Sequence, residues 1–259
     1  MTVDADRVIT SLRAHHDRLA AVLAELSPEE LSGQSAADDW TIAQVVSHLG
    51  SGAQITGGTI LGALGLLSST ESNEAIWARW DASTPEEQVA GFLEHDERVV
   101  AALEATAPDQ RAATMVDLGF LPQPVPLVQA LGMRLNEVAL HTWDILAARD
   151  ASATVDAEAA EIMLEQYAGI AAFMLGFIGK PRELDTGAVI DLDGYTLTVD
   201  DSVSLASGSP AEPTATLHAP HEAAYRLITG RLKPAFTADE VAAEGSVSLD
   251  DLRRVFPGY

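Results

Sequence analysis

The stretch Arg134-Leu-Asn-Glu137-Val-Ala-Leu-His141-Thr-Trp-Asp144 lies in a long run of helical periodicity. Side chains four positions apart on an α-helix stack one turn above the other, so the Glu137 carboxylate and the His141 imidazole can face one point. Asp144 follows His141 by three residues and stays near the same face, where its carboxylate could orient an imidazole. The spacing therefore predicts two metal ligands with a supporting acid.

A metal site needs at least one more ligand, and the best candidate lies far upstream, in Trp40-Thr-Ile-Ala-Gln-Val-Val-Ser-His48-Leu. Thr41 with Gln44 three residues later forms a capping box, which predicts a helix start at this point. His48 then lies about two turns into that helix. Because the helices of a bundle bring distant sequence together, we expect His48 to join the other two ligands.

Four long helices are predicted in the first part of the chain. Apolar residues recur at helical intervals, and capping or proline signals mark helix ends. The helices are expected over residues 4–26, from 41 onward, from 84 onward and over 126–149, with a long connection before the last. Four such helices joined by loops favour a bundle.

The pattern changes beyond residue 150. A helix is expected over 156–177, and β-branched or alternating runs follow at 188–192 and 195–199, separated by Asp193-Gly194, a hairpin signal. The further elements expected are a strand over 214–218, a helix over 220–230, a strand over 241–244 and a helix over 249–256. The sequence thus predicts an α+β protein: a helical bundle over residues 1–152 and a smaller C-terminal α/β domain over 153–259.

Composition restricts the partners and the chemistry. The 259 residues include 15 basic and 39 acidic side chains, and the net charge of -24 opposes binding to nucleic acid or anionic membranes. The chain has no cysteine, so any thiol chemistry must import its thiol. The first residues lack a signal-peptide pattern, and the apolar stretch 55–67 is short and interrupted by glycines, so we expect a cytoplasmic protein without a membrane span.

Taken alone, the Glu-x3-His spacing leaves simpler interpretations open. Glu137 could form an exposed pair with Arg134, and His141 could lie at the rim of the bundle. The glycines that follow His48 could weaken its helix or leave room for a ligand. The stretch 55–67 could form a pocket wall or a subunit contact, and we favour the pocket wall.

The other histidines are expected to have no part in a site. His15 and His16 are adjacent and diverge on a helix, and His95 lies among acidic residues, so we expect all three to be solvated. His218 and His221 flank a predicted strand-to-helix junction without an evident third ligand. We expect them at the surface or between domains.

A resemblance to a known family rests on these residues: Trp40-Thr41, His48-Leu49, Arg134, Glu137, His141 and Trp143-Asp144. They look like the paired signatures of the mycothiol-dependent maleylpyruvate isomerase family, a branch of the DinB-like four-helix metalloproteins. Leu227-Ile-Thr-Gly-Arg231, followed by Val241-Ala-Ala-Glu-Gly245 and a short helix, is similar to that family's C-terminal domain. The resemblance covers nearly the whole chain, and it implies a DinB-like four-helix bundle in the N-terminal part.

The resemblance also implies a divalent metal, usually zinc, held by His48, Glu137 and His141, with an open position for water or for the thiol mycothiol. Many DinB-like relatives have a histidine at the position of Glu137, so the glutamate places this chain closer to the isomerase branch. Two imidazoles and one carboxylate suit catalytic zinc, because the fourth position stays exchangeable. Zinc deprotonates a bound thiol, so we expect a thiolate that attacks a small electrophile. The thiolate would either isomerise a cis double bond and leave again, as in an isomerase, or stay attached to the electrophile, as in an S-transferase.

An anionic substrate would need a cation beside the metal. Arg231 is our first candidate, from its place in the family-like Gly-Arg pair, and Arg226 is the second. Either could instead be a solvated charge at a helix end. Arg134 could orient Glu137 or hold substrate. Arg231 and Asp144 are thus the predicted catalytic residues.

Two rival functions share part of this site. A bundle could bind metal or another ligand without catalytic turnover, or the polar residues could be structural in a protein that acts through partner contacts. The sequence leaves the electrophile and the choice between monomer and homodimer open.

Overall fold

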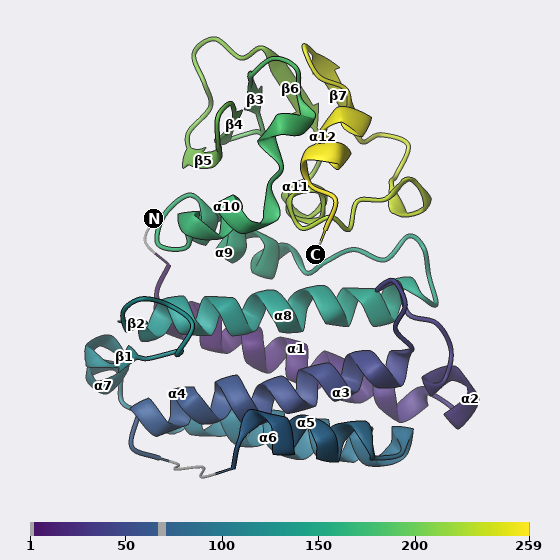
Figure 1. Ribbon diagram of the computed structural model, residues 1–259, viewed down its shortest axis with the longest axis vertical. Helices are drawn as coiled ribbons and strands as arrows, with labels where there is room; N and C mark the ends of the chain where they lie inside the picture. Colours follow the sequence, from purple (N-terminus) through teal and green to yellow (C-terminus); the bar gives the residue numbers. More distant parts are fainter. Residues whose placement is uncertain (1–2, 67–70, 259) are drawn as a thin grey trace. The chain divides into compact units, whose positions relative to one another are not determined.

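The structure is a computed structural model that describes residues 3–66 and 71–258. Its contacts divide the chain into two compact units, Val3–Arg149 and Asp150–Tyr259 (Figure 1). The first unit is built from helices with one short strand pair, and the second combines helices with a five-stranded sheet. The predicted α+β class is confirmed.

Four long helical segments form the first unit and lie side by side (Figure 1). They are α1 (Ala5–Glu25), α3 (Ile42–Gly52), α6 (Pro85–Ala105) and α8 (Leu127–Ala147). Each of the four contacts two others, in the cyclic order α1, α6, α3, α8. Large apolar side chains fill the space between them, among them Leu12, Leu49, Phe92, Leu103 and Leu131. The four predicted helices are confirmed.

Local hydrogen bonds specify where α3 begins, and therefore where His48 lies. The Thr41 hydroxyl accepts from the Gln44 amide at 3.2 Å, and the Gln44 side chain accepts from the Thr41 amide at 2.8 Å. This reciprocal capping box satisfies two amides that the first turn of a helix leaves without partners. The same arrangement of Thr84 with Glu87 opens α6. In each of these two helices, a pair of residues three positions apart thus sets where the helix begins.

The helix that begins with α3 does not end at its glycines. It continues through a π-helical segment, η1 (Ala53–Gly57), into α4 (Gly58–Ala63). A Cβ atom at Gly50 would lie 2.1 Å from the Trp80 ring, and one at Gly57 would lie 2.5 Å from Val99. The expectation that these two glycines leave room for a ligand is wrong, because side chains of the protein occupy the space beside them.

Several short elements lie where the sequence indicated only loops. They are α2 (Pro28–Leu31), α5 (Asn73–Asp81), α7 (Pro108–Ala113), and strands β1 (Met115–Val116) and β2 (Val125–Pro126), which pair antiparallel. Of these, α5 carries Trp80, which is buried against α3. The long connection before α8 is therefore partly structured.

The second unit is organised around a sheet with the strand order β5-β4-β3-β6-β7. The strands are β3 (Ala188–Asp191), β4 (Tyr195–Val199), β5 (Val203–Ser207), β6 (Ala215–His218) and β7 (Ala242–Gly245). All neighbours are antiparallel except β3 and β6, which are parallel. The helices are α9 (Ala157–Tyr167), α10 (Leu175–Ile178), α11 (His221–Ile228) and α12 (Leu249–Val255). Strand β5 was not predicted.

The tight turn between β3 and β4 is the predicted hairpin. Asp193 and Gly194 have φ angles of 51° and 98°, in the left-handed region that Asp tolerates and Gly favours. Asp191 pairs with Thr196 directly beside the turn. The Asp-Gly signal is confirmed, and it sets the register of the two strands.

The single helix expected over residues 156–177 is wrong. Helix α9 ends at Tyr167, and a 3-10 turn (Ala172–Met174) then leads into α10. Gly169 lies at the break, where glycine disfavours continuation of a helix. In the part of the chain that the structure describes, no one helix has the length and apolarity to cross a membrane, although α9 taken together with Ala172–Ile178, bent by 87°, meets that test by length and composition.

Candidate metal centre

Three side chains of types that can bind a metal come from two helices and converge in the first unit. His48 comes from α3, and Glu137 and His141 come from α8. One ligand atom from each lies within 4.8 Å of the others. The His48 Nε2 atom is 2.9 Å from Glu137 Oε2, and the His141 Nε2 atom is 3.7 Å from the same oxygen. The structure thus brings together the three residues that the sequence analysis named.

A buried carboxylate orients one of the two imidazoles. Asp144 Oδ2 lies 2.8 Å from His141 Nδ1, and the Asp144 side chain is almost fully buried. A carboxylate accepts a hydrogen bond there, so Nδ1 is the donor in this contact, and Nε2 is the ring nitrogen on the side of Glu137. An imidazole held in this way is prepared to bind a metal through Nε2.

Trp40 forms a wall beside both imidazoles. Its ring is stacked on His141 at a centroid distance of 5.9 Å and lies 5.1 Å from the ring of His48. The Trp40 carbonyl accepts from the Ser35 amide and hydroxyl at 2.9 and 2.7 Å and from the Gln34 side chain at 2.9 Å, which anchors the loop. Trp40 belongs to the family signature, but its position beside the two imidazoles was not predicted from the sequence. Its place directly before the helix cap was the available signal.

The residues present fit a catalytic zinc ion. Two imidazole nitrogens and one carboxylate oxygen match the three protein ligands of such sites, which leave a fourth position exchangeable. The side chains of His48 and Glu137 are 39% and 35% exposed, whereas His141 is 9% exposed. The three side chains can thus be reached from solvent on the side of His48 and Glu137.

Arg134 is bound inside the bundle. Its Nη2 atom donates to Asp96 Oδ1 at 2.7 Å and to the Leu49 carbonyl at 3.0 Å, and the side chain is buried. The alternative left open by the sequence, an exposed pair of Arg134 with Glu137, is therefore contradicted.

The two candidate substrate arginines belong to the second unit. Arg226 is buried, and its Nε and Nη2 atoms donate to the Glu222 carboxylate at 2.8 and 2.9 Å. Its carboxylate-binding face is already used, so the expectations of a substrate cation or a solvated charge are both wrong for Arg226. Arg231 is half-buried and donates to the Thr229 carbonyl at 3.2 Å. Its contact with substrate stays a prediction.

The expectation that the upstream histidines are solvated is wrong for His15 and His16. His15 and His16 are buried: His15 Nδ1 lies 2.8 Å from the Ser11 carbonyl oxygen, and His16 Nδ1 lies 2.9 Å from Asp96 Oδ2. The hydrogen bond to the Asp96 carboxylate raises the pKa of His16. His95 is half-buried, and burial lowers its pKa. Sequence spacing gave no signal for the bond between His16 and Asp96, which joins residues 80 positions apart.

The two histidines of the second unit have separate surroundings. The side chain of His218 is half-exposed, and its Nε2 atom lies 3.6 Å from Glu244 Oε2. His221 lies between Glu161 Oε2, 2.6 Å from its Nδ1, and the Asp193 carbonyl, 2.9 Å from its Nε2. His221 thus ties the start of α11 to α9 and to the β3–β4 turn.

Three comparisons relate the chain to known proteins. A family model described as the mycothiol maleylpyruvate isomerase N-terminal domain matches residues 12–146. The uncharacterized proteins MT0763 and Rv0738, from two strains of Mycobacterium tuberculosis, are each 29% identical over 178 residues, which is 66% of this chain and 84% of each relative.

Two solved structures share the fold. A crystal structure of the mycothiol-dependent maleylpyruvate isomerase has a TM-score of 0.63 at 19% identity, and a mutant of that enzyme has the same score at 18% identity. Each match covers 95% of this chain and 97% of the other. At this low sequence identity, the similarity shows a shared fold, and this shared fold includes both units of the chain.

Proposed function

The chain belongs to the mycothiol maleylpyruvate isomerase family, and from that membership we propose that it is a zinc-dependent enzyme that uses mycothiol, either as an isomerase or as an S-transferase. The observation that carries the proposal is the convergence of His48, Glu137 and His141 within 4.8 Å. Mycothiol and maleylpyruvate occur in the name of the family and in the name of the enzyme whose structures are similar.

The donor set supports zinc as the resident ion, although another divalent ion would suit the same ligands. When bound, the ion would lower the pKa of a coordinated thiol and so supply a thiolate near neutral pH. The chain contains no cysteine, so the nucleophilic sulfur must belong to a cosubstrate. Mycothiol is the thiol that the family name indicates.

The side chains of the site have separable tasks. His48 and His141 present neutral nitrogen donors, and Glu137 supplies the single negative charge of the ligand set, so a divalent ion there would keep net positive charge for an anionic sulfur. Asp144 holds the proton of His141 on Nδ1 and keeps Nε2 available. Trp40 covers one side of the imidazoles and keeps water from that side.

Two reactions of a thiolate fit this arrangement. Addition to an activated cis double bond forms a C–S bond and leaves a single bond about which the chain of the substrate rotates; expulsion of the same thiolate then restores the double bond in the trans form. In S-transfer the thiolate displaces a leaving group, which departs with its electron pair, and the C–S bond remains. Both reactions use a small electrophile and share the requirement for a thiolate.

Residues 1–152 would hold the metal. Arg231 remains our candidate for the substrate cation, because a guanidinium can bind a carboxylate through two hydrogen bonds. We also propose a cytoplasmic location, because a reducing compartment keeps a low-molecular-weight thiol in its free form.

Metal analysis of the purified protein tests the site. We expect stoichiometric zinc in the wild type and in His218→Ala, a control that removes an exposed imidazole, and loss of zinc in His48→Ala and Glu137→Ala. Metal content unchanged in both site variants would overturn the proposal.

Product analysis tests the reaction. The zinc-loaded protein is incubated with mycothiol and either a cis-unsaturated keto acid or a panel of electrophiles, and products are read by mass spectrometry and chromatography. A trans product with no thiol consumed indicates the isomerase, and a thioether indicates the S-transferase. Zinc binding without either product would support a non-catalytic binding module.

A further inference from the structure

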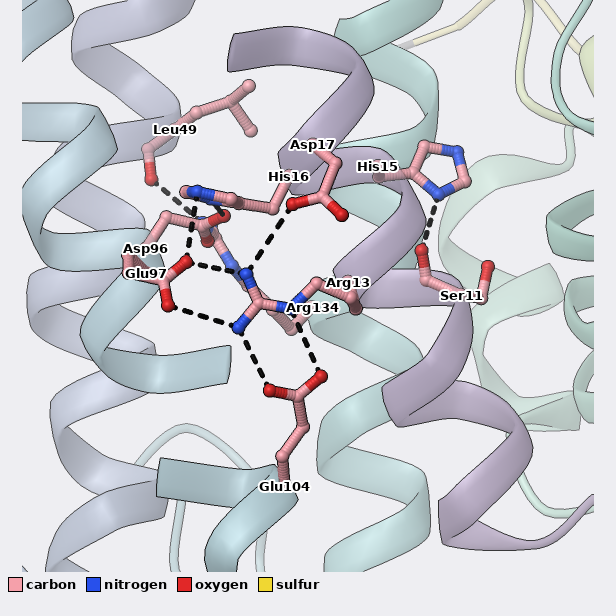
Figure 2. A network of polar contacts seen from close by, with 10 residues as sticks. All are labelled: Ser11, Arg13, His15, His16, Asp17, Leu49, Asp96, Glu97, Glu104 and Arg134. Atoms are coloured by element: carbon pink, nitrogen blue, oxygen red, sulfur yellow. Dashed lines mark hydrogen bonds and ion pairs between the residues drawn. The ribbon is translucent and has the colours of Figure 1, made fainter. Parts of the chain in front are cut away.

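A buried ionic cluster lies inside the helical bundle, apart from the three ligands. Asp96 of α6 and Arg134 of α8 are 2% and 3% exposed, and Arg134 Nη2 donates to Asp96 Oδ1 at 2.7 Å (Figure 2). The other carboxylate oxygen of Asp96 lies 2.9 Å from Nδ1 of His16, on α1. This cluster of three residues joins three of the four bundle helices.

The same guanidinium reaches the fourth helix directly beside a ligand. Arg134 Nη2 also donates to the carbonyl of Leu49, at 3.0 Å, and Leu49 is the residue after His48 on α3 (Figure 2). On α8, Arg134 precedes Glu137 by three residues, which is just under one helical turn. The arginine therefore connects the two ligand-bearing helices at the level of the ligands.

The backbone of α3 is adapted to this contact. The amide of Ala53 is shared between the carbonyls of Leu49 and Gly50, so the helical hydrogen bond to Leu49 is divided where the π-helical segment begins. A Cβ atom at Gly52 would lie 3.0 Å from Arg134 Nη1. Glycine at this position leaves the guanidinium its space, and the arginine supplies the Leu49 carbonyl with a second donor.

Stability alone is a poor explanation for such a cluster. Removing two charges from water costs several kcal/mol per ion, and apolar residues of similar volume are often equally stabilising. In addition, the Nε atom of Arg134 is buried and has no hydrogen-bond partner among the residues that the structure describes. A buried polar group with an incomplete set of partners favours a role in specifying geometry.

We propose that Arg134, held by Asp96, is a positioning residue of the metal centre: it fixes α3 against α8 and so keeps His48 within reach of Glu137 and His141. The inference rests on the proposed function, since it takes the three side chains as metal ligands. In this role Arg134 contacts neither the metal nor the substrate.

A neighbouring set of ion pairs in the same bundle provides a control. It meets the first cluster at Glu97, whose Oε2 atom lies 3.2 Å from His16 Nε2, but it includes neither Arg134 nor Asp96. Arg13 of α1 donates to Glu97 and Glu104 of α6, with Nη2 to Glu104 Oε2 at 2.9 Å (Figure 2). Its acidic partners, which also include Asp17, all lie on α1 and α6 and not on the ligand-bearing helices. Loss of Arg13 therefore removes bundle ion pairs without touching α3 or α8.

The test compares three variants. Arg134→Met combined with Asp96→Asn removes both charges, while Met keeps the apolar volume of the arginine stem and Asn keeps an acceptor for His16. Arg134→Lys keeps the charge opposite Asp96 but replaces the planar fork by one ammonium group. Arg13→Met is the control.

Each protein is measured in three ways. Zinc affinity is obtained by competition with a chromophoric chelator, coordination geometry from the visible absorption of the cobalt-substituted protein, and folding from urea unfolding of the metal-free protein. We expect the double variant and Arg134→Lys to fold but to bind zinc about 10- to 100-fold more weakly, as for other groups that orient metal ligands, with an altered cobalt spectrum. Arg13→Met should keep its zinc affinity and cobalt spectrum.

The outcomes separate this inference from the proposed function. If the wild type binds zinc and a folded Arg134 variant binds it equally, with the same cobalt spectrum, the positioning role is overturned and the metal site stands. If Arg13→Met weakens zinc as much as the Arg134 variants do, the effect reflects general loss of bundle stability and the inference also fails. If the wild type binds no divalent ion, both proposals fall together.

Discussion

Gly50→Ala is expected to destabilise the helical bundle, although alanine favours helices more than glycine does. Gly50 lies two residues after His48 on α3, where the indole ring of Trp80 packs directly against its Cα. A Cβ atom at Gly91 of α6 would lie 2.9 Å from Cη2 of the same ring. Glycines of two helices thus contact the end of the Trp80 ring, which limits how far the ring can move.

The expected size of the destabilisation follows from these distances. A Cβ atom at residue 50 would lie 2.1 Å from Trp80 Cη2, and carbon atoms pack at about 3.5 Å or more, so the ring must move by roughly 1.4 Å. That movement would strain the hydrogen bond from Trp80 Nε1 to Gln54, now 3.0 Å long. Overpacking of this kind costs about 1–3 kcal/mol, and the helix preference of alanine offsets about 0.5–1 kcal/mol. The difference between these ranges is about 0–2.5 kcal/mol, and we expect a net loss near the middle of it, about 1 kcal/mol, in the free energy of unfolding.

Urea unfolding followed by tryptophan fluorescence measures this loss, because all four tryptophans lie in the first unit. Trp80→Leu supplies the control, since it removes the part of the ring that the new methyl group would meet. Gly50→Ala should be neutral or stabilising in that background. An equal effect of Gly50→Ala with and without the Trp80 ring would refute the packing argument, as would a single variant as stable as the wild type.

Three further predictions concern single side chains. Because hydrogen bonding to Asp96 raises the pKa of His16 above 6.5, its stabilising contribution is complete below the pKa of the unfolded chain and is lost as pH rises through the folded pKa. His16→Gln should therefore lower the urea midpoint more at about pH 6 than at about pH 8.5. Asp144→Asn should weaken zinc binding about 10- to 100-fold in chelator competition, because it removes the charge that orients His141. Thr41→Ala should lower the free energy of unfolding by about 1 kcal/mol, measured with urea, through loss of the helix cap.

Contrary results would be equally specific. A cost of His16→Gln that increased with pH would mean that the neutral imidazole is the stabilising form. Unchanged zinc affinity in Asp144→Asn would remove the carboxylate from the metal centre, and an unaffected Thr41→Ala would show that packing alone determines the start of α3.

The elements that could be predicted from sequence are those with local signals. The capping box of Thr41 and Gln44 sets the start of α3 through contacts within one turn, and Asp193-Gly194 sets the β3–β4 hairpin through the φ angles these residues accept. Apolar periodicity located the remaining long helices for the same reason. In each case the stabilising contacts join residues close together in the chain.

The predictions that failed depend on contacts between distant residues. The helix expected over 156–177 has suitable periodicity, but the chain turns at Gly169. His16 is assigned to solvent if only its neighbours in sequence are considered, whereas its partner Asp96 comes from another helix. The glycines after His48 suggested free space, which the Trp80 ring fills.

The candidate site shows the same division. The spacing of Glu137 and His141 places both on one face of a helix, and this needs no knowledge of the rest of the fold. Inclusion of His48 required the packing of α3 against α8, which the expected helical bundle and the family resemblance implied but the spacing of Glu137 and His141 did not. The position of Trp40 beside the imidazoles and the bond from Arg134 to Asp96 became visible only in three dimensions.

The π-helical segment η1, between α3 and α4, amounts to one residue inserted into an otherwise continuous helix, since its hydrogen bonds span five residues where an α-helix spans four. Both flanks of the segment pack on α6. Deleting a single residue there would let the flanks join as uninterrupted α-helix, with each keeping its face toward α6. A relative shorter by one residue at this point could therefore preserve the whole bundle, and a gap there in an alignment would reflect backbone geometry alone.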